Sequence, residues 1–397
     1  MINTFESLKN KNFRFLVFGM ITMIGGMNIQ MLARAQLGWD LTSSSFAVTL
    51  IGVGFAPPML LFSLYGGVIS DRFDNKNIIQ VGQFGVILIC LFIAISIFTE
   101  TITIYHLFFV SLLQGTFWAF MMPARQSIIA ELVDENQLNN AISLNAAGMA
   151  LTTMISPAIG GMIYHYFGAG VTYLLIAFFC IVASITTSML PKGELKKKSN
   201  SKVITQIKEA LDIIYKNSLI KYLLAIALIT TLLSMPTRAL LAPYSSEILY
   251  GGALEVGLML AAIGAGALIG TLTAASLPQK TKKGKYILIT SVISGLSILL
   301  LGFSSFLIFS LILCFFLGIG DAGRRSLNPS MIIEKTPTEF RGRVMGFYSM
   351  SFGFIPLGAI PMGIIADLYG VNFAFIIAGI TLVLLTIIFS RKDIRQS

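Results

Sequence analysis

The stretch from Leu41 to Ser70, LTSSSFAVTLIGVGFAPPMLLFSLYGGVIS, decides the fold. It contains no Asp, Glu, Lys or Arg. It is longer than the roughly 20 apolar residues that an α-helix needs to cross the hydrocarbon core of a bilayer. Within lipid, a helix satisfies every backbone N–H and C=O group internally. The stretch therefore predicts a membrane-spanning helix and places the chain among integral membrane proteins.

Similar uncharged runs lie along the rest of the chain. In the first half they are Phe15 to Ala33, Asn77 to Thr99, Thr101 to Ala124, and Asn136 to Pro191, which is long enough for two spans with a break at Tyr166 to Gly170. In the second half we expect spans near residues 219–242, 253–277, 286–303, 306–325, 343–365 and 371–390. The 397 residues are 55% hydrophobic and 12% charged, about half the charged fraction of an ordinary soluble protein. The fold class predicted is an all-α membrane protein with about twelve transmembrane helices.

The basic residues indicate the topology. The net charge is +10, which could suggest a nucleic-acid partner. However, threading twelve spans with the N-terminus inside places all but two of the 28 Lys and Arg residues on one side of the membrane. Cytoplasmic loops carry such an excess, so we expect both termini in the cytoplasm, anionic membrane lipids as partners and no nucleic acid. The two exceptions are Arg34 and Arg238.

Several landmarks recur about 204 positions later in the chain. They are Arg34 and Arg238, Ile128 to Glu131 and Ile332 to Glu334, Pro157 and Pro361, and Phe167-Gly168 and Tyr369-Gly370. Many transporters are built from two such internal repeats. We therefore expect two pseudo-symmetric six-helix bundles at residues 1–190 and 219–397. A cytoplasmic linker at 191–218 joins them, and the helical spacing of its apolar residues from Val203 to Ile214 predicts an amphipathic helix.

No feature of the chain predicts an enzyme, a metal site or a cofactor. Gly-x-Ser-x-Gly, His-Glu-x-x-His and the phosphate-binding Gly-x-x-x-x-Gly-Lys-Ser/Thr loop are absent from the sequence. The cysteines Cys90, Cys180 and Cys314 lie within apolar spans, so we expect packing residues rather than disulfides or metal ligands. The first span is too long for the apolar part of a cleaved signal, and we expect it to be retained.

The loop after the second span reads Gly67-Val68-Ile69-Ser70-Asp71-Arg72-Phe73-Asp74-Asn75-Lys76. It resembles the signature loop of the major facilitator superfamily, with Asp74 and Asn75 where that loop has a second glycine and a basic residue. The resemblance implies the major facilitator fold and a gating role for this loop. The residues expected to take part are Gly67, Asp71, Arg72 and Lys76, with Asp71 contacting Arg341 and Arg343 at the start of the eleventh span.

The fifth span carries Gly148 and then Ser156-Pro157-Ala158-Ile159-Gly160-Gly161. This segment resembles the glycine–proline motif of antiporter branches of the superfamily. Proline removes a backbone hydrogen bond and glycine permits close helix contact, so Pro157, Gly160, Gly161 and the repeated Pro361 predict helix bends. The motif favours export, and the alternative is an ordinary kinked packing helix.

Further stretches resemble a narrower bacterial group, which contains the enterobactin exporter and macrolide-efflux proteins. They are Pro123 to Val133, Leu138 to Ala141, Leu144-Asn145 and Gly251 to Gly270. The resemblance implies a monomeric exporter in the bacterial inner membrane, driven by an ion gradient. Proton-linked antiporters often carry an arginine four residues before a glycine in the fourth span, but Ser111 stands there in Ser111-Leu112-Leu113-Gln114-Gly115.

A small set of residues is left as candidates for substrate binding and coupling. Charges within the membrane are costly and point to function or to pairing. The polar residues of the first and seventh spans form two equivalent stripes that could face one cavity, although both arginines could instead snorkel to the outer interface. Asp321 could handle protons or substrate, or could pair statically with Arg324 or Arg325. The candidates are Gln30, Arg34, Trp118, Met122, Thr231, Ser234, Arg238, Asp321 and Tyr348.

These residues predict a secondary transporter that exports a small amphiphilic molecule, either a siderophore or metallophore or a drug. We expect alternating access coupled to protons or another ion. Two arginines against one acid favour an anionic or zwitterionic substrate over a cationic drug. The alternatives are a lipid or lysolipid flippase and a nutrient importer of the same fold, followed by a channel or an intramembrane enzyme.

Overall fold

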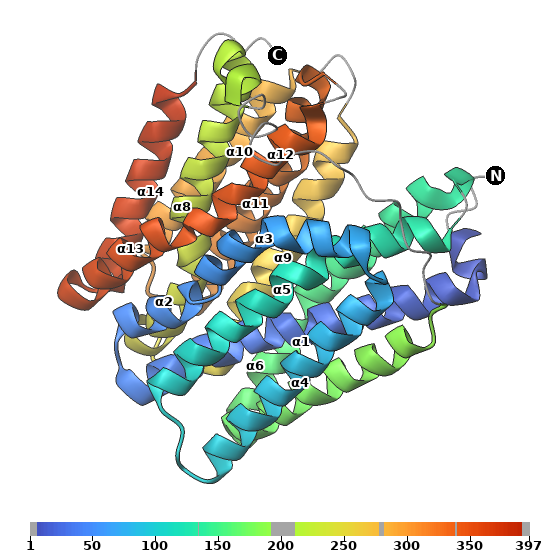
Figure 1. The fold of residues 1–397 in the computed structure, drawn as a ribbon. Coiled ribbons are helices and arrows are strands. Elements are labelled where there is room, and N and C mark those ends of the chain that lie inside the picture. The colour runs from blue at the N-terminus through green and yellow to red at the C-terminus, as the bar shows by residue number, and fades with distance from the viewer. Residues whose placement is uncertain (1–5, 134, 192–210, 278–281, 338–339, 391–397) are drawn as a thin grey trace. The chain divides into compact units, whose positions relative to one another are not determined.

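The computed structural model describes residues 6–133, 135–191, 211–277, 282–337 and 340–390 (Figure 1). These residues form helices and connecting turns, with no strand among them. The first half contains η1 (Glu6–Lys9), α1 (Lys11–Thr42), α2 (Ser45–Val53), α3 (Ala56–Arg72), α4 (Asn75–Phe98), α5 (Ile104–Leu132) and α6 (Glu135–Ser188). The second contains α8 (Ser218–Ile248), α9 (Ala253–Ala275), α10 (Lys283–Leu301), α11 (Leu307–Lys335), α12 (Arg341–Met350), η3 (Ser351–Phe354), α13 (Ile355–Tyr369) and α14 (Val371–Ile388).

Eleven helical stretches in the described residues are long and apolar enough to cross a membrane. One of them lies in α6, where Gly168 has φ 80° and ψ 175° and divides the 54 residues into two helices. The break predicted at Tyr166 to Gly170 is confirmed, and with it about twelve spans. Gly370 has a similar conformation between α13 and α14, with φ 91°. Glycine adopts this positive φ without the strain that a Cβ atom would cause.

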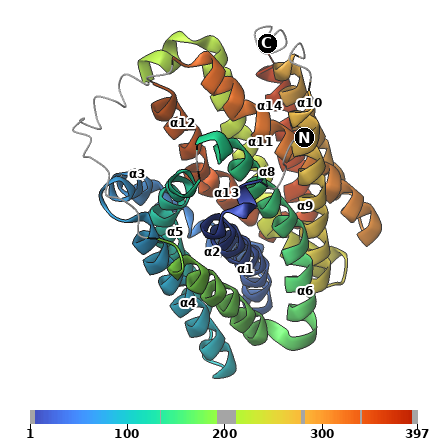
Figure 2. The ribbon, with the colours of Figure 1, turned by 90° about the vertical axis from the view of Figure 1, so that its right-hand side faces the viewer.

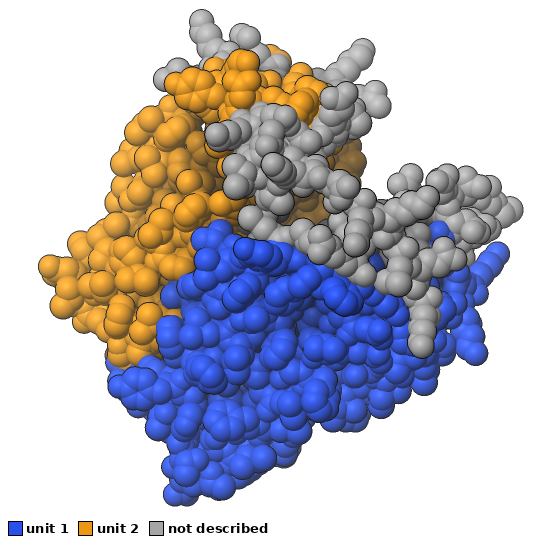
Figure 3. Space-filling model, in the orientation of Figure 1, with its two compact units in different colours: residues 1–43, 51–198, 252–257 blue, residues 44–50, 199–251, 258–397 orange. Residues whose placement is uncertain are grey.

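The chain divides into two compact units, which are coloured separately in Figure 3. Unit 1 comprises residues 1–43, 51–198 and 252–257. Within it α1 packs along α6, α4 packs against α5 and α6, and α3 packs along α5 (Figure 2). Asn10 and Asp74 cap the first turns of α1 and α4 by accepting backbone N–H bonds, which starts these helices at the ends of the spans.

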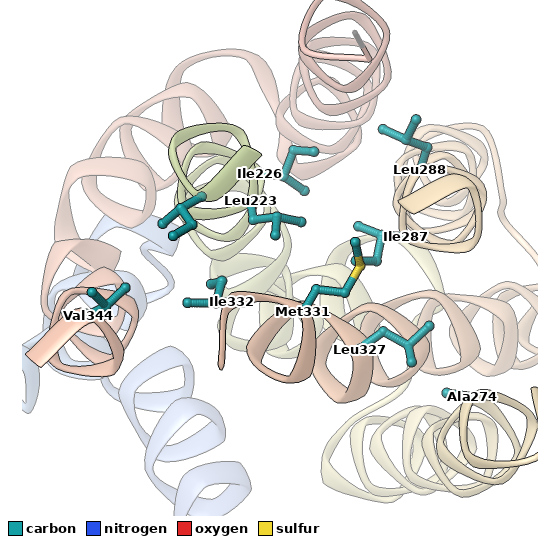
Figure 4. Packing of buried hydrophobic residues seen from close by; sticks show 10 residues of the cluster. Leu223, Ile226, Ala274, Ile287, Leu288, Leu327, Met331, Ile332 and Val344 are labelled. Carbon is teal, nitrogen blue, oxygen red and sulfur yellow. The ribbon is translucent and has the colours of Figure 1, made fainter. Parts of the chain in front are cut away.

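Unit 2 comprises residues 44–50, 199–251 and 258–397. Its helix α10 packs against α11 and α14, and α8 packs against α13 and α14. A buried apolar cluster joins several of these helices (Figure 4). Its members are Ile220, Leu223, Ile226, Ala274, Ile287, Leu288, Leu327, Met331, Ile332 and Val344. The cluster holds α11 between α8, α10 and α12, and so fixes the helix that carries Asp321.

The predicted linker falls mostly outside the described residues. Residues 211–216 are helical, which is the end of the segment where the apolar spacing predicts an amphipathic helix. The boundaries of the two bundles and the linker remain predictions.

Small residues bring α9 and α11 into close contact within unit 2. A Cβ atom on Gly266 would collide with the carbonyl oxygen of Phe315, and one on Gly318 would collide with that of Ile263. Gly270, one turn after Gly266, faces Ile319 in the same way. Small residues at such positions let helix backbones approach closely in membranes. The contact lies one turn from Asp321 and therefore positions it.

We expect Gly318→Ala to lower the stability of the protein, because the new methyl group must push α9 and α11 apart. Overpacking of this kind costs about 1–3 kcal/mol. Thermal unfolding of the purified protein in detergent measures the effect. The matched control is Gly346→Ala in α12, where a Cβ atom meets nothing within 4 Å. Equal melting temperatures for the two variants would show that the α9–α11 contact is not tight.

Candidate functional site

A chain of polar side chains crosses the interior of unit 1. The Arg34 guanidinium donates through NH1 to Ser111 Oγ at 3.0 Å and to Gln114 Oε1 at 2.9 Å. Gln114 Nε2 donates to Gln30 Oε1 at 2.5 Å, and Gln30 Nε2 contacts Cys90 Sγ at 3.7 Å. Gln30 and Arg34 lie one turn apart on α1. Ser111 and Gln114 lie one turn apart on α5. The two helices are thus joined by a continuous hydrogen-bonded path.

This path contains a buried cation, the guanidinium of Arg34. Arg34 is 9% exposed, and Gln30 and Ser111 are fully buried. In the described part of the chain no carboxylate forms an ion pair with Arg34. Neutral hydrogen-bond acceptors offset only part of the desolvation of a buried charge. The interior of unit 1 around Arg34 is therefore electropositive, and a bound anion would stabilise the buried guanidinium.

The contact between Arg34 and Ser111 joins two candidate positions that the sequence does not connect. Ser111 stands where related antiporters often carry an arginine in the fourth span. The structure brings a guanidinium to this position from α1 instead. The residues are far apart in the sequence, and an apolar helix gives no signal for which neighbour its few polar side chains will meet.

Unit 2 contains a second buried polar cluster, centred on Asp321. Ser234 Oγ lies 2.8 Å from both carboxylate oxygens, and Ser294 Oγ donates to Oδ1 at 3.2 Å. The Arg324 NH2 group donates to Oδ1 at 3.2 Å, and the Arg238 NH2 group lies 3.6 Å from Oδ2. Three helices contribute, because Ser234 and Arg238 belong to α8, Ser294 to α10, and Asp321 and Arg324 to α11.

The cluster keeps a charged carboxylate in the membrane interior. Asp321 is 2% exposed and Arg324 is 4% exposed, while the Arg238 side chain is 15% exposed. Two guanidiniums and two hydroxyls surround the acid, so the charged form is well solvated by the protein. Protonation would remove one negative charge and leave both cations uncompensated. The charge of the cluster therefore depends on the protonation state of this one acid.

Most members of this cluster are predictable from the sequence, but their assembly is not. Ser234 and Arg238 lie on the polar stripe of the seventh span, while the partners that the sequence offers Asp321 are Arg324 and Arg325. The structure joins the stripe to Asp321 and Arg324. Thr231 is buried one turn before Ser234. Ser294 was missed, because one serine in an apolar helix gives no signal that it bonds a carboxylate.

The remaining candidates occupy less polar surroundings. Trp118 is buried in α5, with the Arg125 guanidinium 5.9 Å from its ring. Met122 and Tyr348 are half-buried. The Tyr348 ring meets Phe352 edge to face, with centroids 6.4 Å apart.

Most of the predicted gating side chains lie outside the described part of the structure. They are those of Gly67, Asp71, Arg72, Arg341 and Arg343. Lys76 is described, and its Nζ donates to the backbone oxygens of Ser188 at 2.7 Å and Leu190 at 2.5 Å. This contact ties the start of α4 to the end of α6.

The glycine–proline segments lie within long helices. Pro157 is inside α6 and Pro361 is inside α13. A Cβ atom on Gly160 would crowd Ile29 of α1, and one on Gly161 would collide with the backbone of Ala253. The two glycines therefore allow close helix packing.

The fold is that of the major facilitator transporters. The structure resembles that of the nucleoside transporter NupG, with a TM-score of 0.80, 13% identity, and coverage of 95% of this chain and 98% of that one. The sequence matches the transmembrane secretion effector family over residues 2–397, so the chain belongs to that family. It is a multi-pass membrane transporter of small molecules and not an enzyme.

Similar proteins include exporters with different named substrates. The staphyloferrin A transporter of Staphylococcus aureus is 25% identical over 373 residues, covering 90% of this chain and 91% of that protein. Macrolide efflux protein A of Streptococcus pyogenes is 22% identical over 358 residues, 87% of each chain. The enterobactin exporter of Shigella boydii is 24% identical over 382 residues, 93% of this chain and 88% of that one.

Proposed function

We propose that this transporter exports a small anionic or zwitterionic amphiphile of the siderophore or metallophore type from the bacterial cytoplasm. The observation that carries the proposal is Arg34, a buried guanidinium with polar contacts to Ser111 and Gln114 and no ion-paired carboxylate among the described residues. An anionic substrate group supplies the missing counter-charge. Two of the similar proteins are named for staphyloferrin A and enterobactin, which supports this class of substrate.

The proposed coupling site is the Asp321 cluster. With Asp321 charged, Arg238 and Arg324 are paired; with Asp321 protonated, both are released. The longer contact, 3.6 Å to Arg238, is the easier one to break. A proton arriving at Asp321 thus changes the charge that unit 2 presents to a substrate. Alternating access then requires only that the two protonation states favour different conformations by a few kcal/mol.

The proposed orientation in the membrane determines the side on which the gate closes. Both termini lie in the cytoplasm, on the side that carries the basic loops. Asp71 and its neighbours Gly67 and Arg72 close that side through Arg341 and Arg343 in one conformation and release them in the other. The protein works as a monomer within the inner membrane.

Transport into inside-out proteoliposomes tests the proposed function. We expect an imposed pH gradient to drive accumulation of a catecholate or citrate-based chelator by about tenfold or more over a sample with the gradient collapsed, since each 1.4 kcal/mol of driving force is tenfold. A cationic dye should accumulate weakly under the same gradient. Strong dye transport without chelator transport would identify a general drug pump. Movement of a labelled phospholipid alone would identify a flippase.

A further inference from the structure

The eleventh span of the chain, which lies in unit 2, is interrupted by η3, and η3 packs against α8, the helix that carries Ser234 and Arg238. The apolar stretch Val344–Tyr369 is not one continuous α-helix, because the 3-10 turn η3 at Ser351–Phe354 separates α12 from α13. Pro356 follows in the first turn of α13. Discontinuous helices in transporters tend to mark the places where substrates and ions bind. The side chains around η3 are therefore candidates for substrate contacts.

Arg325 lies against this interruption. It is exposed, and its guanidinium carbon is 5.9 Å from the centroid of the Phe352 ring in η3. Phe352 in turn meets Tyr348 of α12, with the two rings at 82°. The guanidinium of Arg325 thus lies over one ring of an aromatic pair, and this arrangement is not part of the Asp321 cluster.

The charges explain why Arg325 is available to a ligand. Arg325 lies one helical turn after Asp321, a spacing at which an ion pair often forms. Both oxygens of Asp321 already bond Ser234 and the other guanidiniums, at Arg324 and Arg238. No carboxylate in the described ranges forms an ion pair with Arg325. Of these three guanidiniums, Arg325 is the one that forms no ion pair with a carboxylate of the described residues.

We propose that Arg325, Phe352 and Tyr348 form a subsite for a planar aromatic ring bearing an anionic group, such as a hydroxyaryl carboxylate or a catecholate. The inference rests on the proposed function and names the part of the substrate that this site takes. Guanidinium groups stack on aromatic faces while their edge N–H groups bond a carboxylate or paired oxygens in the plane. A flat aryl anion satisfies both the aromatic pair and the free donors.

The walls of this subsite are held by the apolar core of unit 2. Leu327 and Val344, on α11 and α12, belong to the buried cluster drawn in Figure 4. Phe347 and Tyr348 pack against that cluster. A site whose supporting residues are fixed by packing binds with less loss of conformational freedom.

Binding measurements with two matched anions test the subsite. The probes are salicylate and the cis-2-hydroxy derivative of cyclohexanecarboxylate (called cyclohexanecarboxylate below), which carry the same charge and the same hydroxyl group and differ in the aromatic ring. Calorimetric titration of the purified transporter in nanodiscs of neutral lipid should show salicylate binding about fivefold or more tightly, the range expected for one aromatic contact. Arg325→Gln should weaken the binding of both anions by about tenfold, because the charge-assisted hydrogen bond is lost.

The remaining variants separate the ring from the charge. Phe352→Leu should reduce salicylate to the affinity of cyclohexanecarboxylate and leave the latter within about twofold. Arg325→Lys should keep part of the charge effect but lose most of the preference for salicylate, because an ammonium group does not stack. The control Lys335→Gln, at the exposed end of the same helix, should leave both affinities unchanged. Melting temperatures show whether each variant is folded. If Arg325→Gln does not fold, the variants Phe352→Leu and Arg325→Lys still test the proposal.

Three results would overturn the subsite. The first is salicylate affinity unchanged by Arg325→Gln but lost in an Arg34 variant, which leaves the proposed function intact and moves the anion site to unit 1. The second is an equal loss of affinity for salicylate and for cyclohexanecarboxylate in Phe352→Leu. The third is anion binding abolished by phosphatidylglycerol in the nanodisc, which would assign Arg325 to a lipid phosphate. Binding of a cationic dye with no binding of either anion would instead contradict the proposed function itself.

Discussion

Asp321→Asn is expected to destabilise the protein and to remove transport driven by a pH gradient. Asp321 is the carboxylate between Arg238 and Arg324, and an amide in its place leaves two guanidiniums in the bundle interior without a counter-ion. Removing one partner of a buried ion pair costs about 3–5 kcal/mol. Thermal unfolding and proteoliposome uptake measure the two effects separately.

A double variant separates a structural from a coupling role. In Asp321→Asn combined with Arg324→Gln, the more deeply buried cation is removed together with the acid, so stability should recover. If Asp321 carries the coupled proton, this stable double variant still fails to respond to a pH gradient. If gradient-driven uptake recovers together with stability, Asp321 serves only as a structural counter-ion. Asp212→Asn is the control, because its pair with Lys216 is exposed on both sides, 58% and 73%, and should change neither readout.

The bilayer explains why the spans could be predicted from the sequence. Hydrocarbon thickness sets the length of each apolar run, and the need to satisfy backbone groups selects helices. The break at Gly168 was predictable because glycine between aromatic and small residues ends a helix without strain. The division of the eleventh span at Ser351–Phe354 was not, since its residues are as apolar as those on either side.

The partners within each polar cluster were less predictable than its members. Intramembrane polarity singled out Arg34, Ser234, Arg238 and Asp321, because such residues are few in this chain. Their contacts depend on how each helix is rotated in its bundle, and helices that are apolar on every side carry little periodic signal for that rotation. For this reason the stripe on α8 and the acid on α11 were assigned separately, although the structure shows one cluster.

Arg34→Gln is expected to reduce export of an anionic substrate by about tenfold or more without destabilising the fold. Loss of a partly desolvated, charge-assisted bond to the substrate is worth at least about 1.4 kcal/mol, which is that factor. The fold should tolerate the change, because the variant removes a buried charge that has no ion-pair partner among the described residues. A glutamine can still bond Ser111 or Gln114. This combination of lost transport and retained melting temperature distinguishes a functional cation from a structural one.

Restoring a guanidinium to the site from α5 provides a sharper test. Ser111→Arg in the Arg34→Gln background returns a guanidinium to the same hydrogen-bonded path, but from α5, where related antiporters often carry it. If the charge at this position is what the substrate requires, the double variant should recover a substantial share of the lost transport. Ser111→Arg alone should be poorly tolerated, since it adds a second guanidinium to the buried path in which Arg34 already donates to Ser111 at 3.0 Å. Full activity of Arg34→Gln toward anionic chelators would instead mean that Arg34 only links α1 to α5, and substrate charge would then have to be read by unit 2.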